Sequence, residues 1–408
     1  MPTVTWAAVR SRRLARHGLA TPFDGPPEAV VRAMCGAAHA QVTSAGELSV
    51  ALRLAGADRR DVQVALWTDH TLVKTFGPRG TVHLLPTADL PMWTGALSTL
   101  PEQSPFPDDI RMTAEQTDAV LAGIAAVLAD AELTVDELTE ALADTVGPWA
   151  AEKVMPAFQE LWPRWRQATS LAAHRGVLCF GANRGRKVTY TSPRRWLPGL
   201  APAPGASGAS GASGALLKAY LHAYGPARPR DFAQWLAAPR GWATEVFDTV
   251  AGELERVDVD GIEGWVVAGD LDAPVDPPGG LRLLPYFDAY AVGSHPRERV
   301  YPGRAAERAL AGSQAGNFPV LLIDGDRRRR LAPAPGRQAA RRHRRAARPA
   351  LRRPAPRAHH AGGPGRRDPR RHPRADHRPG HRRGARLKVR AGLPPILLKS
   401  TSSYADLG

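Results

Sequence analysis

Two polar side chains separated by one small residue, His39 and Gln41, form the pair best suited to chemistry on a bound water. The Gln41 amide can donate and accept hydrogen bonds, so it could hold a water in place. The His39 imidazole titrates near neutrality and could orient the same water or take its proton. The alternatives are structural: His39 could cap carbonyls at a helix end, and Gln41 could be a polar turn residue. At a helix end the two side chains would lie about 200° apart, so one of them would support the site rather than touch the substrate.

A second pair, Arg79 and His83, flanks the turn Gly77-Pro78-Arg79-Gly80. An arginine at such a turn could contact a phosphate of DNA or form a wall of the binding pocket, and we place both residues among the predicted DNA contacts. The alternative for Arg79 is a structural role in which its guanidinium satisfies turn carbonyls. His83 alternates with Leu84 in a predicted strand, so it could face a cleft or solvent.

Three basic residues, Arg184, Arg186 and Lys187, gather at the tip of another predicted hairpin. They could contact phosphates, or they could belong to a solvated loop.

Asp288 lies in an aromatic stretch with Tyr286 and Tyr290. We expect Asp288 to be a buried hydrogen-bond anchor of the pocket rather than a catalyst.

The elements that must position His39 and Gln41 follow from hydrophobic spacing. Apolar residues at helical intervals predict helices over 4–20, 28–40, 46–55 and 59–67. Residues 72–76 and 82–85 read as strands around the Gly77–Gly80 turn. Three helices followed by a two-stranded ribbon are the order of a winged-helix module.

The same order recurs along the chain. Helices are predicted over 113–129, from the capping box Thr134–Glu137, and over 150–169, followed by strands at 177–180 and 188–190. After a Pro- and Gly-Ala-Ser-rich linker, helices over 215–224, 229–238 and 242–254 precede a strand at 264–267, and further strands are expected within 281–325.

We therefore predict an α+β chain of tandem winged-helix modules around a small β-barrel, with an irregular basic C-terminal tail. The expected parts are a first module with the His-x-Gln motif (1–100), a second module (101–200), the linker (201–215), a third module (216–270), the β-barrel strands (271–325) and the tail (326–408).

The formal net charge of +16 is concentrated in the tail. Residues 326–390 contain 24 Lys and Arg and three Asp, whereas the remainder contains 31 basic and 36 acidic residues. Any contact with DNA before residue 326 must therefore come from local basic patches, because that part is mildly acidic.

The tail loses all apolar periodicity from Asp326 onward and is dominated by Arg, Pro, Ala, His and Gly. One interpretation is a disordered basic tail that binds nucleic acid without specificity. We favour translation of a GC-rich coding region out of frame, because with GC-rich codons assigned to Asp326–His343 a shift by one base can give an alternating, glycine-punctuated pattern typical of a β-hairpin. The nucleotide sequence tests this: the hypothesis fails if the second frame is closed or encodes no hairpin.

Several classes of protein are disfavoured by what the sequence lacks. Two cysteines, Cys35 and Cys179, argue against a disulfide framework and favour a reducing cytoplasm. We find no signal peptide, no apolar run long enough to span a membrane, no metal-ligand cluster and no nucleotide-binding loop. We therefore expect a cytoplasmic protein without metal or other cofactor.

Four stretches together resemble one family of three-winged-helix proteins, the crosslink-repair or AlkZ-like DNA glycosylases. The stretches are Ala37-Ala38-His39-Ala40-Gln41 with Leu52-Arg53; Leu72-Val73-Lys74-Thr75-Phe76-Gly77-Pro78-Arg79-Gly80-Thr81-Val82-His83-Leu84-Leu85; Pro229-Arg230-Asp231-Phe232-Ala233-Gln234-Trp235; and Leu283-Leu284-Pro285-Tyr286-Phe287-Asp288-Ala289-Tyr290 with Arg297 and Arg299. They occur in the family's order and cover most of residues 1–325.

The resemblance implies a monofunctional glycosylase that removes N7-alkylated purines, including interstrand crosslinks made by genotoxic natural products, and so a role in DNA repair and self-resistance. The family's catalytic motif is Gln-x-Gln or Gln-x-Asp, and the matching positions here are His39 and Gln41. The second Gln is kept and the first is replaced by His. The implied partner is double-stranded DNA, alkylated or crosslinked, bound by a monomer.

Two other functions compete with a glycosylase that directs water to C1′. A non-catalytic winged-helix protein, such as a regulator, usually carries one module in a dimer that reads a palindrome. Three modules in one chain favour instead a monomer that wraps DNA around a lesion. The remaining alternative is an inactive pseudogene product, whose reading frame is lost before its last strands.

Overall fold

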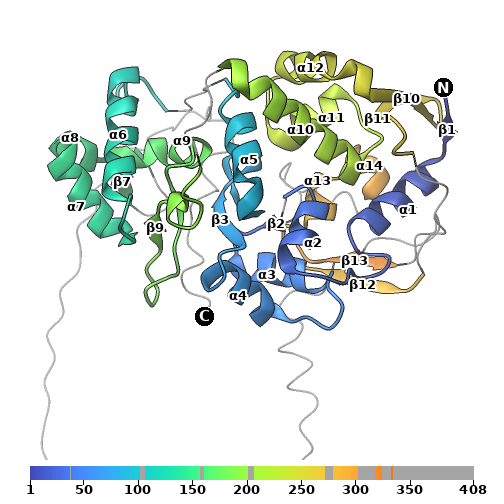
Figure 1. Cartoon of the computed structure of the whole chain (residues 1–408), viewed down its shortest axis with the longest axis horizontal. Helices are drawn as coiled ribbons and strands as arrows, with labels where there is room; N and C mark the ends of the chain where they lie inside the picture. Colours follow the sequence, from blue (N-terminus) through green and yellow to red (C-terminus); the bar gives the residue numbers. More distant parts are fainter. Residues whose placement is uncertain are drawn as a thin grey trace, which may run out of the picture. The chain divides into compact units, whose positions relative to one another are not determined.

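The computed structural model describes most of the chain up to residue 333. The described residues are 1–36, 38–101, 106–156, 160–200, 206–271, 279–301, 316, 318–323 and 332–333. Helices and strands are mixed along the chain, which confirms the α+β class (Figure 1). Within the described residues, no helix combines the length and apolar character needed to cross a membrane.

The first hundred residues place helices around a three-stranded antiparallel sheet of order β2-β4-β3. Its elements are α1 (Trp6–Arg16), α2 (Pro27–Ala33), β2 (Ala38–His39), α3 (Thr43–Ala51), α4 (Arg59–Trp67), β3 (Leu72–Phe76), the 3-10 turns η1 (Pro78–Gly80) and η2 (Thr87–Asp89), β4 (Val82–Pro86) and α5 (Leu90–Leu97). The predicted helix at 59–67 and both predicted strands are confirmed.

The prediction of one helix over 28–40 is wrong at its C-terminal half. Helix α2 ends at Ala33, because Cys35 and Gly36 take left-handed backbone angles with φ of 55° and 59°. The chain then enters β2, so His39 lies in a strand rather than at a helix end. This difference decides the geometry of the motif.

The next hundred residues contain a second helical set with a hairpin. Its elements are α6 (Ala114–Val127), β5 (Leu133–Thr134), α7 (Val135–Thr145), α8 (Pro148–Ala151), β6 (Lys153–Pro156), β7 (Leu161–Pro163), η3 (Arg164–Ala168), α9 (Thr169–His174), β8 (Cys179–Phe180), β9 (Thr189–Thr191) and η4 (Pro193–Arg195). The capping box predicted at Thr134 and Glu137 is confirmed.

The prediction of a helix over 150–169 is wrong. Strands β6 and β7 pair antiparallel within this range, with Met155 opposite Trp162. Pro156 and Pro163 end these two strands, and neither can donate the amide hydrogen bond that a helix interior requires.

The third helical set begins inside the segment predicted as a linker. Helix α10 runs over Ala206–Tyr224, so the expectation of a flexible linker at 201–215 is wrong from Ala206 onward. Alanine favours helix, and the buried residues Leu216, Leu217 and Tyr220 anchor the helix that the repeat extends. The following elements are α11 (Pro229–Leu236), α12 (Arg240–Thr249), η5 (Ala251–Glu253), β10 (Leu254–Val259) and β11 (Ile262–Val267).

The last described elements form an open sheet, not a barrel. They are β12 (Leu281–Leu284), α13 (Ala289–Gly293), α14 (Arg297–Val300), β13 (Val320–Ile323) and β14 (Ala332–Pro333). The predicted closed barrel is wrong for the part of the chain that the structure describes, because three strands of at most four residues pair in the order β12-β13-β14 and are too few to close. Apart from β14, the predicted tail lies outside the described residues.

Packing joins these segments through a shared hydrophobic core. Trp93 of α5, Trp165 of η3 and Trp235 of α11 are each at most 1% exposed and belong to one continuous cluster. The assignment of the individual helical sets as winged-helix modules, and the boundaries between them, stay predictions.

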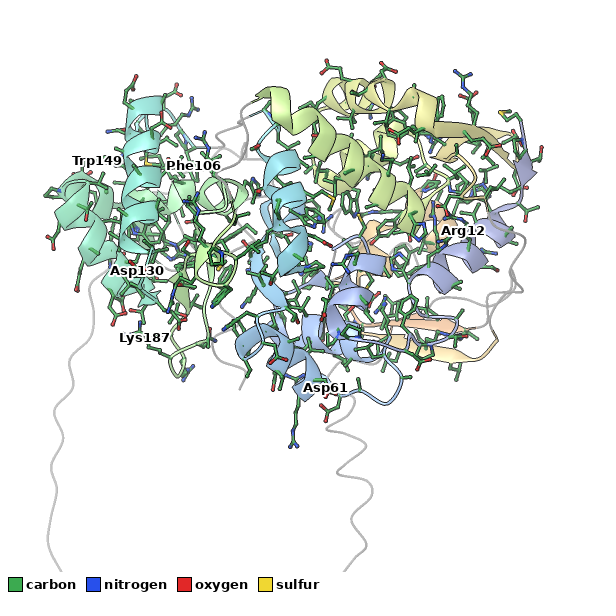
Figure 2. All side chains as sticks on the ribbon, in the orientation of Figure 1. Arg12, Asp61, Phe106, Asp130, Trp149 and Lys187 are labelled. Atoms are coloured by element: carbon green, nitrogen blue, oxygen red, sulfur yellow. The ribbon has the colours of Figure 1, made fainter. Side chains whose placement is uncertain are left out.

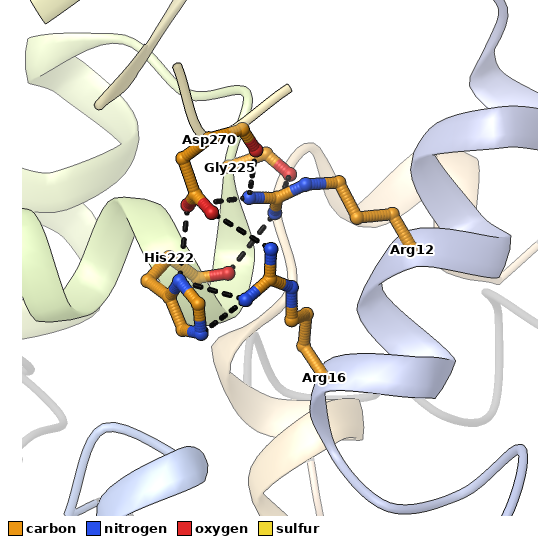
Figure 3. Close-up of polar contacts among 5 residues, drawn as sticks. All are labelled: Arg12, Arg16, His222, Gly225 and Asp270. Atoms are coloured by element: carbon orange, nitrogen blue, oxygen red, sulfur yellow. Dashed lines mark hydrogen bonds and ion pairs between the residues drawn. The ribbon is translucent and has the colours of Figure 1, made fainter. Parts of the chain in front are cut away.

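The N-terminal segment is attached to residues more than 200 positions later. Strand β1 (Thr3–Val4) pairs in parallel with β10, and the Trp6 amide donates to Asp260 at 3.0 Å. Arg12 and Arg16 of α1 each form a 2.7 Å ion pair with Asp270 (Figure 3).

Candidate active site

His39 is clamped between two rings at the centre of the first sheet. Strand β2 places His39 opposite His83 of β4, and the two imidazoles meet edge-on with centroids 5.1 Å apart. On its other side His39 stacks on Phe287, with centroids 4.6 Å apart and planes 25° apart. These contacts leave His39 only 7% exposed, so its ring is held in one orientation.

Two glycines allow this close packing. A Cβ at Gly46 of α3 would lie 2.9 Å from the His39 carbonyl oxygen, so only glycine lets the helix approach β2 so closely. Phe287 has a left-handed φ of 55°, and its amide donates to the Gly316 carbonyl at 2.8 Å. A Cβ at Gly316 would lie 2.9 Å from the Phe287 Cα. The ring that stacks on His39 is therefore fixed by its backbone.

His83 is fixed by hydrogen bonds to both ring nitrogens. Its Nδ1 lies 2.8 Å from the Thr81 carbonyl, to which it donates, so Nε2 is left to accept from Arg79 at 3.4 Å. His83 is fully buried behind His39. In this place it can form a wall of the site, whereas a surface contact with DNA would have to come from other residues.

Arg79 sits at the turn with a left-handed φ of 63°. Its guanidinium donates to the Trp235 carbonyl of α11 at 2.6 Å, so the carbonyl that it satisfies lies on another element and not in its own turn. Arg79 thus ties the β3–β4 hairpin to α11 and presents positive charge to His83.

Burial keeps both imidazoles neutral. Burial, and then the charge of Arg79, lower the pKa of His39 to about 3. Burial and the neighbouring His39 and Arg79 hold the pKa of His83 well below its usual value. The His39 Nδ1 accepts a long hydrogen bond from the Gln41 amide at 3.4 Å. A neutral imidazole that accepts at Nδ1 carries its proton on Nε2, so His39 offers a donor to a ligand.

Gln41 is partly exposed, in contrast to His39. It lies between the end of β2 and the start of α3, where Val42 provides no side-chain cap. Residues two positions apart in a strand would face the same side, but Gln41 lies beyond the end of β2, so its side chain does not share the surroundings of His39. Of the pair, His39 is therefore the packed member and Gln41 the one that solvent reaches.

Asp288 joins the loop of Phe287 to helix α3. Its carboxylate forms a bidentate ion pair with Arg53, at 2.8 Å for each oxygen, and accepts from the Ser49 hydroxyl at 2.7 Å. It also caps α13 by accepting from the Tyr290 amide at 3.0 Å. Burial alone would raise the pKa of Asp288, but the Arg53 guanidinium and the Ser49 hydrogen bond hold it below its usual value. This geometry is that of a positioning anchor.

The predicted basic hairpin tip is engaged by carboxylates of α7. Arg184 pairs with Glu137 and Lys187 with Asp136, each at 3.0 Å, and Arg186 lies between them in the β8–β9 hairpin (Figure 2 labels Lys187). Exposed pairs of this kind are weak, so a phosphate could replace the carboxylates. A contact of these three residues with DNA stays a prediction.

Sequence reasoning did not single out Phe287, Trp235, His295 or Arg297 as site residues. Phe287 and Arg297 stand in the fourth stretch of the resemblance, so the signal was present, but only the fold reveals the stack on His39. Trp235 acts through its backbone carbonyl, which no residue type signals.

Comparisons with known proteins identify the family of the chain. The family model described as "DNA glycosylase AlkZ-like" matches residues 32–370, a range that includes part of the basic segment. A curated relative, the interstrand DNA cross-link repair glycosylase of Streptomyces sahachiroi, is 32% identical over 353 residues, covering 79% of this chain and 86% of the relative. The solved structure of Streptomyces sahachiroi DNA glycosylase AlkZ superposes with a TM-score of 0.66 at 29% identity, covering 81% of this chain and 87% of that one. The chain therefore belongs to the AlkZ-like DNA glycosylase family.

Proposed function

We propose that this protein is a monofunctional DNA glycosylase that excises N7-alkylated purines, including crosslinked ones, from double-stranded DNA. The observation that carries the proposal is the motif itself: a partly exposed Gln41 beside a neutral His39 held between His83 and Phe287. Family membership supports the reaction type, and the name of the curated relative supports crosslinked DNA as one substrate.

The chemistry demands little from the protein because the substrate is already activated. Alkylation at N7 makes the purine cationic, so the electron pair of the C1′–N9 bond leaves with a base that becomes neutral. The sugar then carries oxocarbenium-like charge, and water adds its oxygen to C1′ and releases one proton to solvent. No strong base is needed, only a residue that holds the water.

Gln41 and His39 divide this task. The Gln41 amide oxygen accepts a hydrogen bond from the water and raises the electron density on its oxygen. His39 donates from Nε2 and so orients the water or a sugar oxygen; with a pKa of about 3 it stays neutral at physiological pH. His39 is therefore assigned as a hydrogen-bond donor and not as a general base.

The replacement His39→Gln tests this assignment. A glutamine amide can place an NH group near the position of the imidazole Nε2, so we expect excision within about threefold of wild type. His39→Phe, which keeps a ring but no donor, should lose about 10-fold or more. Wild-type rates should be flat from pH 5.5 to 8 under conditions where the protein stays folded. A general base at His39 would instead make His39→Gln as poor as His39→Phe.

The alternative of a glycosylase that forms an imine with a lysine finds little support. Among the lysines that the structure describes, only Lys74 is buried; its amine donates to the Thr43 hydroxyl at 2.8 Å and lies over the Phe180 ring. Burial lowers the pKa of Lys74 to about 8. Because the amine is held by both contacts, we propose attack by water.

The decisive experiment uses duplex DNA that carries 7-methylguanine. We expect the full-length protein to release the free base and to leave an abasic site that alkali cleaves, while sodium borohydride traps no protein–DNA adduct. The control is undamaged duplex of the same sequence. Failure to release either 7-methylguanine or a larger N7 adduct would reject the enzyme and favour a DNA-binding protein without catalysis.

A further inference from the structure

Several partly or fully buried arginines of the described chain have a carboxylate partner. Arg53 pairs with Asp288, and Arg12 and Arg16 share Asp270 in the cluster of Figure 3. Arg13, Arg79 and Arg297 differ, because none of them forms an ion pair with any residue that the structure describes. Of the three, Arg79 contacts His83 in the candidate active site.

Neutral groups alone hold two of these guanidinium ions. Arg79 donates to the Trp235 carbonyl and to the His83 imidazole. Arg13, 2% exposed, donates to the carbonyls of His295 at 2.8 Å and Pro226 at 3.2 Å. No carboxylate among the described residues pairs with either guanidinium, although their hydrogen-bonding groups are largely used.

Arg297 still has donors to offer. Its Nε is buried and finds no hydrogen-bond partner among the described residues. Two positions earlier, His295 is 2% exposed and its Nε2 is likewise buried without a partner in the described chain. Two polar side chains, two positions apart in the chain, thus have donor or acceptor atoms that no described residue satisfies.

Hydrogen bonds fix the surroundings of these groups: Arg13 holds the carbonyl of His295, two residues before Arg297, and Arg79 holds that of Trp235 on α11. Burial lowers the pKa of Arg79 to about 10, and the charge of Arg297 contributes to that shift. Burial lowers the pKa of His295 to about 3, and Arg297, Arg13 and Arg79 all contribute. The carboxylate of Asp231 acts in the opposite direction on His295, but it is already paired with Arg228 at 2.8 Å.

A buried guanidinium without a counter-charge is costly, and a bound anion removes that cost. Arginine presents its NH groups as a planar fork that fits two oxygens of a phosphate. We propose that Arg297 binds the DNA phosphate adjacent to the damaged nucleotide, with Arg79 and Arg13 adding positive potential. The proposal rests on the proposed function and names the substrate group that completes its site.

The bound phosphate would also offset the repulsion between the arginines and the positive charge of the reacting nucleotide. An N7-alkylated purine and an oxocarbenium-like sugar are both positively charged, so bare arginines beside them would oppose catalysis. A phosphate held by Arg297 brings negative charge next to the sugar as its positive charge develops. The DNA would thereby supply the anion that stabilises its own transition state, and Arg297 would fix where that anion lies.

Single methylphosphonates, which remove the charge of one phosphate, test the proposal. In duplexes with one 7-methylguanine, we expect one position next to the lesion at which the substitution slows wild-type excision. Arg297→Gln should lose roughly 10- to 100-fold in kcat/KM with the normal duplex and become insensitive to the substitution at that position. Arg297→Lys, which keeps the charge, should keep part of the sensitivity and controls for misfolding. Arg299→Gln, an exposed neighbour on α14, should behave like wild type.

The outcomes separate this proposal from the proposed function. If wild type releases the base and a folded Arg297→Gln remains as sensitive as wild type at every position, the phosphate site is wrong and the glycosylase stands. If wild type releases no base, the function fails, and equilibrium binding decides about the site. In that case Arg297→Gln should lower the slope of log K against log salt by about 0.9, the value for one phosphate contact, and an unchanged slope would overturn the proposal.

Discussion

Replacement of Gln41 by alanine should reduce the single-turnover rate of 7-methylguanine excision by about 100-fold, the usual effect of removing one group that positions a reactant or stabilises charge. The methyl side chain can neither accept from nor donate to the attacking water, while the stack of His39 on Phe287 is left in place. Binding of the damaged duplex should change by no more than a few-fold. The rate is measured by quench-flow or manual sampling, followed by alkaline cleavage.

Two further variants make the Gln41 result specific. Gln41→Glu keeps an oxygen acceptor and should retain more activity than Gln41→Ala. Gln234→Ala removes the amide of an exposed residue on α11 and should have no effect. A Gln41→Ala protein with the wild-type rate would show that the water is held elsewhere and would remove the motif from the mechanism.

Acidification should unfold the protein well above the pH at which carboxylates are protonated, because several histidines are buried as neutral rings. Burial is the first cause of the lowered pKa of His17, His39 and His295, each about 3, and of His174, about 4. In the unfolded chain these rings take up protons near pH 6.5. Stability is therefore complete above about pH 6.5 and falls as the pH decreases toward the folded-state values.

The expected loss in the free energy of unfolding is large compared with the total stability of a typical domain. Between pH 7.5 and 5.5 each such histidine removes up to about 1.4 kcal/mol, so the four remove about 5 kcal/mol, comparable to the whole stability of many domains. Urea titrations at each pH measure it. His17→Phe keeps a ring against Tyr224 and Tyr290. It should reduce by one the number of protons taken up on unfolding, and so make the free energy of unfolding less dependent on pH. A free energy of unfolding that is constant from pH 7.5 to 5.5 would contradict the prediction.

The sequence was informative where local signals and tertiary packing agree. The β3–β4 hairpin, the α6 and α7 helices and the Thr134 capping box all follow from alternation, helical spacing and capping chemistry within about 15 residues. The errors came where proline, left-handed residues or distant contacts decided the outcome. Pro156 and Pro163 turn an apparently helical stretch into β6–β7, and Cys35 and Gly36 end α2 before the motif.

The candidate site was predictable in its residue types but not in its arrangement. The resemblance selected His39, Gln41, Arg79, His83 and Asp288, yet spacing alone suggested that His39 lies at a helix end. Its neutral state depends on Phe287, 248 positions later, and on burial that only the tertiary structure creates. The lack of a carboxylate partner for Arg13 and Arg297 among the described residues could not be predicted either, because ion pairs depend on the tertiary structure.

The attachment of β1 and α1 to distant partners sets an order for synthesis. Trp6 and Arg12 find their partners at Asp260 and Asp270, 254 and 258 residues later. A ribosome that adds about 5 to 20 residues per second needs roughly 13 to 50 seconds to deliver those partners after the N-terminal helix is made. During that interval the apolar face of α1, with Trp6 and Val9, has no surface to cover it. Helix α1 is thus translated early but packs late, and we expect chaperones to bind its uncovered apolar face during that interval.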